Sequence, residues 1–546
     1  MLKILKASAG SGKTFTLAGE YIRLLFAGEP DCDPHAYRHI LAVTFTNKAT
    51  DEMKSRILKE LHIMATSPEK SSYIAEILEM RKDLSPADVA KMARRFLCNI
   101  LNDYGAFSVS TIDSFFQRAL KAFSREIGQF SSYQGKLDKA PLAKESVDRV
   151  LDSLTEKDKN LLKWLSDSVM EQLNSDGRFS IENQLYEMAA ALHDEGHRTL
   201  AESLDLDDRK IYSRENLGRL REGCRKVIDG FAGKVSGAAA AVLEALDKAG
   251  VQPEEFNRKF LSRIRDYAEV NGNKAIPAPT EAFLRNSASP DLWFAKSKAG
   301  LRASVEGILE EPLGHFCNLF SDDYKTYKTA LALLGQIYSL GLAGELEDSF
   351  NELVKEKNVM SIDDSNTILR GIIDGSDAPF IYEKLGVRYD HFLLDEFQDT
   401  SGIQWENFRP LLAESLAGGN ANLIVGDVKQ SIYRWRNSDW NLLNSKLYEE
   451  FPGEYEKDVL DANWRSVDNV VDFNNGFYEY AAKALDSVSG NRGISEIYSD
   501  VRQEKRSRDA SKGNVDVMFC KDEDQIEAVV AEVRRLTEGG AAYSDI

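Results

Sequence analysis

The sequence lacks the patterns that mark secreted, membrane-spanning and disulfide-stabilised proteins. Its five cysteines form no C-x-x-C pair and no zinc-finger spacing, which argues against a disulfide framework and an iron–sulfur cluster. No apolar run is long enough to span a bilayer, and a strand is expected from Leu2, where a signal peptide would otherwise begin. We therefore expect reduced thiols, no membrane partner and a cytoplasmic location.

The sequence also lacks an excess of positive charge. It contains 88 acidic and 69 basic residues, which gives a net charge of −19 over 546 residues. This balance argues against general coating of nucleic acid, but it allows a groove whose charge is set by nearby side chains. A chain of this length is too long for one hydrophobic core, so we expect about three or four domains.

The most informative feature present is a phosphate-binding loop at residues 7–14, with the sequence ASAGSGKT and without the usual first glycine. An apolar strand precedes it, and the helix that follows has an apolar face formed by Leu17, Tyr21, Leu24 and Leu25. Lys13 would reach the β- and γ-phosphates, and the Thr14 hydroxyl would bind Mg²⁺. Backbone N–H groups would point at the phosphates from Ala9, Gly10, Ser11 and Gly12.

Strand and helix signals divide the chain into four parts. Strands are expected at 39–45 and 107–110 in the first part, residues 1–120, with a helix between them whose apolar face is Met53, Ile57, Leu61 and Met64. Long amphipathic helices, such as 142–165 and 238–249, dominate residues 121–358. Strands return at 392–394 and 423–425, within residues 359–455. A last part, residues 456–546, contains a strand-like segment at 515–519.

Polar residues after the later strands complete a nucleotide site. Asp395 could hold Mg²⁺, directly or through water, and Glu396 could polarise the attacking water. Gln430 follows the strand at 423–425 and could sense the γ-phosphate. Taken alone, the Asp-Glu pair is also explained as the solvated end of a strand.

Aromatic and arginine residues alternate directly after Gln430, in Tyr433-Arg434-Trp435-Arg436. This composition is typical of a platform on which single-stranded bases stack, each contributing about 1–3 kcal/mol. Core aromatics beside a solvated arginine pair explain the composition equally well.

Four segments, in their order and relative spacing, resemble motifs of the UvrD/Rep superfamily-one DNA helicases. They are AVTFTNKA at 42–49, DEFQDT at 395–400, GDVKQSIY at 426–433 and NWRS at 463–466. Two further segments resemble the RecB/AddA branch, the motor subunits of bacterial helicase–nucleases: STIDSF at 110–115 and MSIDD at 360–364. The resemblance covers both ends of the chain and includes the middle only by position.

The resemblance implies an α/β P-loop NTPase fold. A RecA-like parallel-sheet motor domain would be split by a large all-helical insertion and followed by the start of a second RecA-like domain. ATP and Mg²⁺ would be bound, with single-stranded or duplex-end DNA as partner. Another component of a helicase–nuclease would be a further partner.

The resemblance also implies a role for individual residues. The catalytic residues would be Glu396, Gln430 and Arg465, the last acting as an arginine finger from the second motor domain. Thr14 and Asp395 would bind the metal, and Trp464, in place of the usual tyrosine, would stack on adenine. The single-stranded DNA track would consist of Phe45, Asn47, Tyr433, Trp435 and Arg436.

Some family features are missing. There is no room before the phosphate loop for the glutamine segment that reads adenine, and Asp113 stands where many relatives carry histidine. The later motifs of the second motor domain are absent, so we expect an N-terminal fragment of a longer protein that hydrolyses ATP slowly by itself.

We therefore expect an ATP-dependent DNA helicase or single-strand translocase, the motor part of a recombination or repair helicase–nuclease. Three alternatives remain: a P-loop ATPase that switches a protein partner without nucleic acid, a plain UvrD-type repair helicase without a nuclease, and a non-catalytic DNA-binding subunit that keeps an old nucleotide site.

Overall fold

The computed structural model describes residues 1–28, 32–123, 134–136, 140–174, 181–193, 197, 200, 208–272, 274–295, 300–357, 359–373, 378–490, 492–507 and 513–546. The chain divides into two compact units. Unit 1 comprises Met1–Ser131 and Asp364–Ile546, and unit 2 comprises Ser132–Asp363. Each is described by itself.

Unit 1 is built on a six-stranded sheet in the order β3-β2-β6-β7-β1-β8, in which every pair of neighbouring strands is parallel. The strands are β1 (Leu2–Ala7), β2 (Ile40–Thr44), β3 (Val109–Thr111), β6 (His391–Leu394), β7 (Asn422–Gly426) and β8 (Tyr455–Leu460). The central strands β2 and β7 are buried at every residue, as expected for a parallel sheet covered on both faces. The predicted α/β class with a parallel sheet is confirmed.

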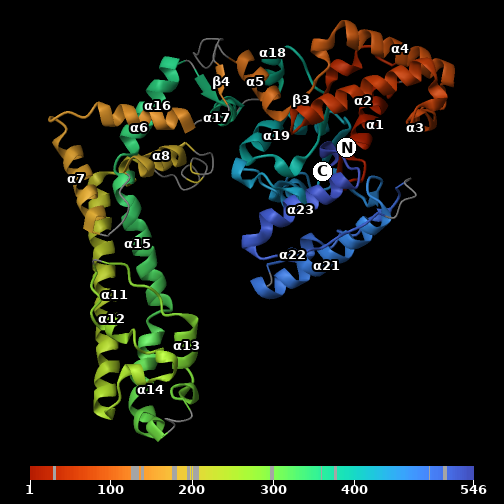
Figure 1. Cartoon of the computed structure of the whole chain (residues 1–546). Coiled ribbons are helices and arrows are strands. Elements are labelled where there is room, and N and C mark those ends of the chain that lie inside the picture. Colours follow the sequence, from red (N-terminus) through yellow and green to blue (C-terminus); the bar gives the residue numbers. More distant parts are fainter. Residues whose placement is uncertain are drawn as a thin grey trace. The chain divides into compact units, whose positions relative to one another are not determined.

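Two helices near the N-terminus show how the pattern produces this layer (Figure 1). The helix α1 (Lys13–Leu25) buries Leu17, Tyr21, Leu24 and Leu25, the predicted apolar face. The helix α2 (Asn47–Thr66) begins after Thr46, whose side chain accepts a hydrogen bond from the Ala49 N–H at 3.1 Å. It buries the predicted face Met53, Ile57, Leu61 and Met64.

The remaining α-helices of unit 1 are α3 (Ile74–Met80), α4 (Pro86–Asn102), α5 (Ile112–Ala122), α18 (Ala378–Leu385), α19 (Gly402–Ala417), α20 (Leu447–Glu450), α21 (Asp468–Ser489), α22 (Ile494–Ile497) and α23 (Gln525–Glu538). The helix α17 (Ile362–Ile373) begins at the boundary with unit 2. Two short parallel strands, β9 (Ala462–Asn463) and β10 (Glu504–Lys505), pair in the C-terminal part.

Three strand predictions for unit 1 need correction. The strand predicted at 107–110 begins at Val109. The strand β8 was not predicted, and it extends the sheet to Leu460, past the expected boundary at residue 455, because its edge position leaves most of its side chains exposed and removes the apolar signal. Residues 515–519 form no strand, and Phe519 is 95% exposed.

Unit 2 is mainly helical, and its long helices α11 (Arg214–Ala249), α14 (Arg302–Asn318) and α15 (Asp322–Leu340) pack on one another. The others are α6 (Ala140–Asp152), α7 (Lys159–Asn174), α8 (Ile181–Leu192), α10 (Asp208–Ile211), α12 (Ile264–Ala268), α13 (Glu281–Ser287) and α16 (Ala343–Lys357). Two parallel strands, β4 (Gln134–Lys136) and β5 (Val359–Ser361), are also present, so the expectation of an all-helical segment is wrong in this detail.

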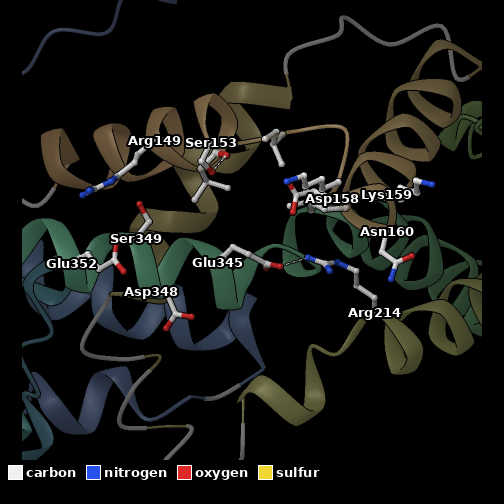
Figure 2. Close-up of a pocket in the computed structure, with 14 residues that line it drawn as sticks. Arg149, Ser153, Asp158, Lys159, Asn160, Arg214, Glu345, Asp348, Ser349 and Glu352 are labelled. Atoms are coloured by element: carbon white, nitrogen blue, oxygen red, sulfur yellow. Dashed lines mark hydrogen bonds and ion pairs between the residues drawn. The ribbon is translucent and has the colours of Figure 1, made fainter.

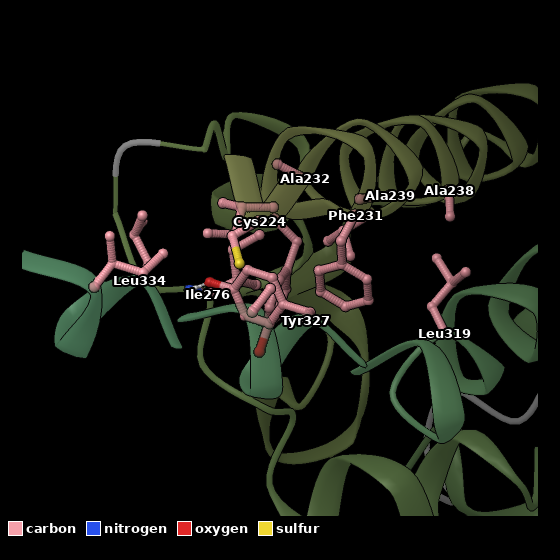
Figure 3. Close-up of a cluster of buried hydrophobic side chains, with 14 of the residues drawn as sticks. Cys224, Phe231, Ala232, Ala238, Ala239, Ile276, Leu319, Tyr327 and Leu334 are labelled. Carbon is pink, nitrogen blue, oxygen red and sulfur yellow. Dashed lines mark hydrogen bonds between the residues drawn. The ribbon is translucent and has the colours of Figure 1, made fainter. Parts of the chain in front are cut away.

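The core of unit 2 centres on the buried face of α11 (Figure 3). The rings of Phe231 and Tyr327 are stacked with centroids 4.6 Å apart, and the Tyr327 hydroxyl accepts a hydrogen bond from the Ile276 N–H at 2.8 Å. The single helix predicted at 142–165 is two helices. The Asp158 carboxylate accepts hydrogen bonds from the N–H and hydroxyl of Thr155 at 2.9 and 2.8 Å, and this turn separates α6 from α7.

Within the described residues, no single helix is both long and apolar enough to cross a membrane. One bent pair, Arg302–Leu340 with Ala343–Lys357, meets the length and composition criteria together.

The packing of α2 makes a direct stability prediction. Leu61→Ala should lower the free energy of unfolding by about 2–5 kcal/mol, because Leu61 is 0% exposed and the substitution leaves a cavity. Urea unfolding followed by circular dichroism measures this loss. The matched control is Leu101→Ala in α4, where Leu101 is 57% exposed and the expected change is within about 0.5 kcal/mol. Equal losses in the two variants would contradict the assignment of the buried face.

Candidate functional site

The predicted site residues follow the carboxyl ends of neighbouring parallel strands in unit 1. The phosphate loop follows β1, Phe45 follows β2, Asp395 follows β6 and Asp427 follows β7. Loops at the carboxyl ends of parallel strands meet at one edge of the sheet, which is where ligands of open α/β proteins bind. The strand order therefore brings Lys13 and Glu396 together, although 383 positions separate them along the chain.

The phosphate loop makes its turn with two glycines in the left-handed region. Gly10 has φ +78° and Gly12 has φ +89°, and Gly12 directly precedes α1. A Cβ on Gly10 would lie 2.8 Å from the side-chain oxygen of Asn463, so this glycine is also required by close packing. The buried hydroxyl of Ser11 has no hydrogen-bond partner within the described residues, as expected for a group that faces a ligand site.

Lys13 joins the two later segments at the start of α1. Its Nζ donates to both carboxylate oxygens of Glu396, at 2.9 and 2.8 Å, and to Oε1 of Gln430 at 3.4 Å. The lysine side chain is 12% exposed and that of Glu396 is 30% exposed. The structure thus brings together the predicted phosphate-binding lysine, catalytic carboxylate and γ-phosphate sensor.

Glu396 is held in an unusual backbone conformation. Its φ of 49° and ψ of 42° lie in the left-handed region, which costs about 1–3 kcal/mol for a residue other than glycine. Gln398 supports this turn. Its Nε2 donates to Glu396 Oε2 at 2.8 Å, and its Oε1 accepts from the Asp427 N–H at 2.9 Å. Strain maintained by such a network is a common property of functional sites.

Two buried carboxyl groups lie beside Glu396. Burial, followed by the charge of Glu396, raises the pKa of Asp395 to about 7, and the same two causes raise the pKa of Asp399 to about 7. Lys13 acts in the opposite direction on both groups. A carboxylate that is costly to ionise in this site gains most from a bound cation.

The donor set fits Mg²⁺ shared with a nucleotide. Among the described residues, no group of three or more His, Cys, Asp or Glu side chains could hold a metal by itself. Thr14 and Asp395, the predicted metal residues, supply one hydroxyl and one carboxylate. Mg²⁺ in phosphate-transfer sites typically takes one or two such protein ligands and completes its shell with phosphate and water.

Aromatic side chains cluster on the surface next to this site. The rings of Phe45 and Tyr433 lie 4.6 Å apart at 35°, and Tyr433 and Trp435 lie 6.0 Å apart. The Arg436 guanidinium lies 5.5 Å from the Phe45 ring and 5.6 Å from the Trp435 ring. Trp435 is 75% exposed, which excludes the interpretation of this residue as core. Asn47 is exposed at the start of α2, two residues after Phe45.

The NWRS segment lies against the phosphate loop. The Trp464 N–H donates to the Gly10 carbonyl at 2.9 Å, and the Trp464 ring is 54% exposed. Arg465 is exposed, and its Cβ is the nearest neighbour after Asn463 to a Cβ built on Gly10. Both residues therefore lie beside the turn that the sequence assigns to phosphate binding.

Several residues of this site were not predicted as functional. They are Gln398, Asp399, Asn463 and Gln503, all polar and all in hydrogen bonds or ion-pair environments of the predicted residues. Gln398, Asp399 and Asn463 lie inside the helicase-like motifs, which is the signal that could have identified them. Gln503 lies in none of these motifs.

Two other features of the molecule carry no predicted residue. A pocket of about 610 Å³ in unit 2 is lined by charged side chains, and Arg214 there is paired with Glu345 (Figure 2). His193 is buried and stacks on Phe350 with centroids 3.7 Å apart, and residues 194–196, the rest of the weak histidine pattern before His197, lie outside the described residues.

The fold and the site define a P-loop nucleotide-binding protein of the α/β class with an exposed aromatic platform beside its phosphate loop. Residues 3–452 match the UvrD/REP helicase N-terminal domain family, and the chain belongs to this family. The predicted resemblance is thereby confirmed.

Curated relatives agree with the predicted branch. The chain is 24% identical over 500 residues to RecBCD enzyme subunit RecB of Escherichia coli strain K12, which covers 88% of this chain and 38% of the relative. It is 24% identical over 490 residues to a component of the ATP-dependent helicase/nuclease of Lactiplantibacillus plantarum, covering 86% and 37%. The corresponding protein of Streptococcus suis is 24% identical over 587 residues, covering 100% and 44%. The chain thus spans less than half the length of these relatives.

The charges of the site predict opposite effects of two substitutions on one group. Glu396→Gln should lower the pKa of Asp395 from about 7, because it removes a neighbouring negative charge. Lys13→Ala should raise the same pKa, because it removes the cation that favours the carboxylate. Carboxyl ¹³C NMR titration of aspartate-labelled protein measures both shifts, with the signal assigned through Asp395→Asn. Shifts in the same direction would contradict this electrostatic arrangement.

Proposed function

We propose that this chain is the motor part of an ATP-dependent DNA helicase that translocates on single-stranded DNA, within a recombination or repair helicase–nuclease. The observation that carries the proposal is the arrangement of residues 427–436. Gln430 touches the phosphate-loop lysine, and Tyr433, three residues on, begins the exposed aromatic cluster. A change at the nucleotide therefore has a short physical route to a base-stacking surface.

In the nucleotide site, Lys13 and the N–H groups of residues 9–12 would bind the phosphates of ATP, and Thr14 and Asp395 would hold Mg²⁺. When bound, Mg²⁺ neutralises charge that develops on the transferring phosphoryl group. Glu396 would accept a proton from the attacking water once the phosphates compete for Lys13. Arg465 would stabilise the same developing charge from the NWRS segment, and Trp464 would stack on the base.

On the DNA side, Phe45, Tyr433 and Trp435 would stack on successive bases, while Asn47 and Arg436 would contact the backbone or base edges. Stacking tolerates any sequence because every base has a π-face. The local positive charge of Arg434 and Arg436 also fits a single strand, despite the net charge of −19.

For the architecture, we propose that residues 1–120 and 359–455 form one RecA-like motor domain interrupted by a helical insertion at 121–358. Residues 456–546 would begin a second RecA-like domain. The separation of unit 2, Ser132–Asp363, from unit 1 supports an insertion at this place. The NWRS segment on the phosphate loop supports a nucleotide site between the two motor domains.

Family membership favours this function over the alternatives. A P-loop ATPase that switches a protein partner would not need an exposed aromatic cluster next to Gln430. A non-catalytic subunit would not need Lys13, Glu396 and Gln430 in mutual contact. A plain repair helicase without a nuclease would share this motor part and differ from the proposal in other domains.

Single-stranded DNA should stimulate ATP hydrolysis by the full chain, and Lys13→Ala should reduce turnover by at least about 100-fold, because it removes the main cation on the β- and γ-phosphates. A coupled phosphate-release assay measures both rates. Lys59→Ala, an exposed lysine on α2, is the control and should hydrolyse ATP at the original rate. Unaltered turnover in Lys13→Ala would show that the loop is not the site.

Removing one ring of the platform should weaken DNA binding without harming nucleotide binding. Trp435→Ala should raise the concentration of oligothymidylate needed for half-maximal stimulation by about tenfold, which corresponds to the loss of one stacked base. Tyr480→Ala is the matched control, because Tyr480 on α21 is equally exposed, at 75%. If the two variants behaved alike, the aromatic cluster would not be the DNA site.

A further inference from the structure

The C-terminal part of unit 1 contacts the phosphate loop through the carbonyl groups of that loop. The Ala9 carbonyl accepts hydrogen bonds from Gln503 Nε2 at 2.9 Å and from Asn463 Nδ2 at 3.4 Å. The neighbouring Gly10 carbonyl accepts from the Trp464 N–H at 2.9 Å. These contacts use the acceptors of the loop and leave its N–H groups to face phosphate.

Asn463 and Gln503 hold each other. Asn463 is 4% exposed, and its Nδ2 also donates to Gln503 Oε1 at 2.8 Å. Its Oδ1 accepts from the N–H groups of Arg465 and Ser466, at 3.0 and 2.8 Å. The backbone of Arg465 is therefore fixed by a side chain that is itself fixed by Gln503.

Gln503 is anchored at its own backbone. Its N–H donates to Asn475 Oδ1 at 2.9 Å, and its carbonyl accepts from Asn475 Nδ2 at 3.0 Å. The next two residues pair with β9, with Glu504 opposite Ala462 and Lys505 opposite Asn463. Little freedom remains for the Gln503 amide other than the geometry that bonds Ala9 and Asn463.

A second connection reaches the same segment through buried ions. Lys429 Nζ lies between Asp427 Oδ1 at 2.9 Å and Asp500 Oδ1 at 2.6 Å, and its side chain is 11% exposed. Burial acts to lower the pKa of Lys429, but the two carboxylates outweigh it and the pKa is raised. Asp427 also accepts from Gln430 Nε2 at 2.7 Å, so polar contacts run from Lys13 through Gln430 to the 500–503 segment.

We propose that Gln503 is a positioning residue for ATP hydrolysis, which sets Arg465 against the phosphate loop through Asn463. The inference rests on the proposed role of Arg465 in that reaction. Gln503 acts by fixing the distance between two catalytic segments rather than by touching the reacting atoms. Displacement of a catalytic group by about 1 Å can cost about 100-fold in rate.

The sharpest test is Gln503→Glu in the full chain. The substitution keeps the size of the side chain and the acceptor for Asn463, but it replaces the donor to the Ala9 carbonyl with an oxygen that repels it. The turnover number of DNA-stimulated ATP hydrolysis should fall by at least about tenfold, while the KM for ATP changes by less than about threefold. Thermal unfolding should stay at the original temperature.

Arg502→Ala is the matched control. Arg502 precedes Gln503, is 73% exposed, and donates to Glu479 at 2.9 Å rather than to the phosphate loop. Its variant should keep the original turnover number.

The double variant Gln503→Glu/Arg465→Ala separates this inference from the proposed function. If Gln503 acts through Arg465, the double variant turns over no more slowly than Arg465→Ala alone. Multiplying losses would overturn the positioning role, as would an unchanged turnover number in Gln503→Glu. If Arg465→Ala itself kept full turnover, the proposed role of the arginine would fail instead.

Discussion

The contact of Lys13 with Glu396 and Gln430 is the interaction on which the rest of the site depends. It joins the loops after β1, β6 and β7, and it exists because these strands are parallel neighbours whose carboxyl ends share one edge. A charged group at a partly buried edge needs a partner, since an uncompensated ion there is costly. The lysine and the carboxylate therefore hold each other in positions that a nucleotide phosphate would enter.

The same constraint explains the polar residues around the contact. Glu396 adopts a strained left-handed backbone, and Gln398 stabilises it by bridging to the start of the β7 loop. Burial raises the pKa values of Asp395 and Asp399 to about 7, so the site holds unfavourable negative charge that a cation relieves. Binding of Mg²⁺ with ATP and loosening of the lysine pair are in this way parts of one electrostatic balance.

Sequence reasoning predicted the buried parts of unit 1 well because their signals are local. The strand β1, the glycine turn and the apolar face of α1 follow one another without interruption, and β6 and β7 are apolar runs ending in polar motif residues. It failed where stability comes from distant partners. The strand β8 is polar and depends on β1 for its hydrogen bonds, and the break at Thr155–Asp158 depends on one side-chain turn. The site shows the same division. Lys13, Asp395, Glu396 and Gln430 belong to motifs whose chemistry can be inferred from residue type and spacing. Gln503 is an ordinary glutamine outside these motifs, and its contact with Ala9 lies 494 residues away along the chain, so only the folded structure brings the two together.

The most direct measurement of coupling between the nucleotide site and the aromatic platform is the affinity of the full chain for a fluorescent oligothymidylate, with and without a saturating non-hydrolysable ATP analogue and Mg²⁺. Because coupling between two sites is typically about 1–3 kcal/mol, the analogue should change the affinity by at least about fivefold, and Gln430→Ala should abolish the difference. Equal affinities with the analogue demonstrably bound would contradict the proposal that residues 427–436 connect ATP to DNA.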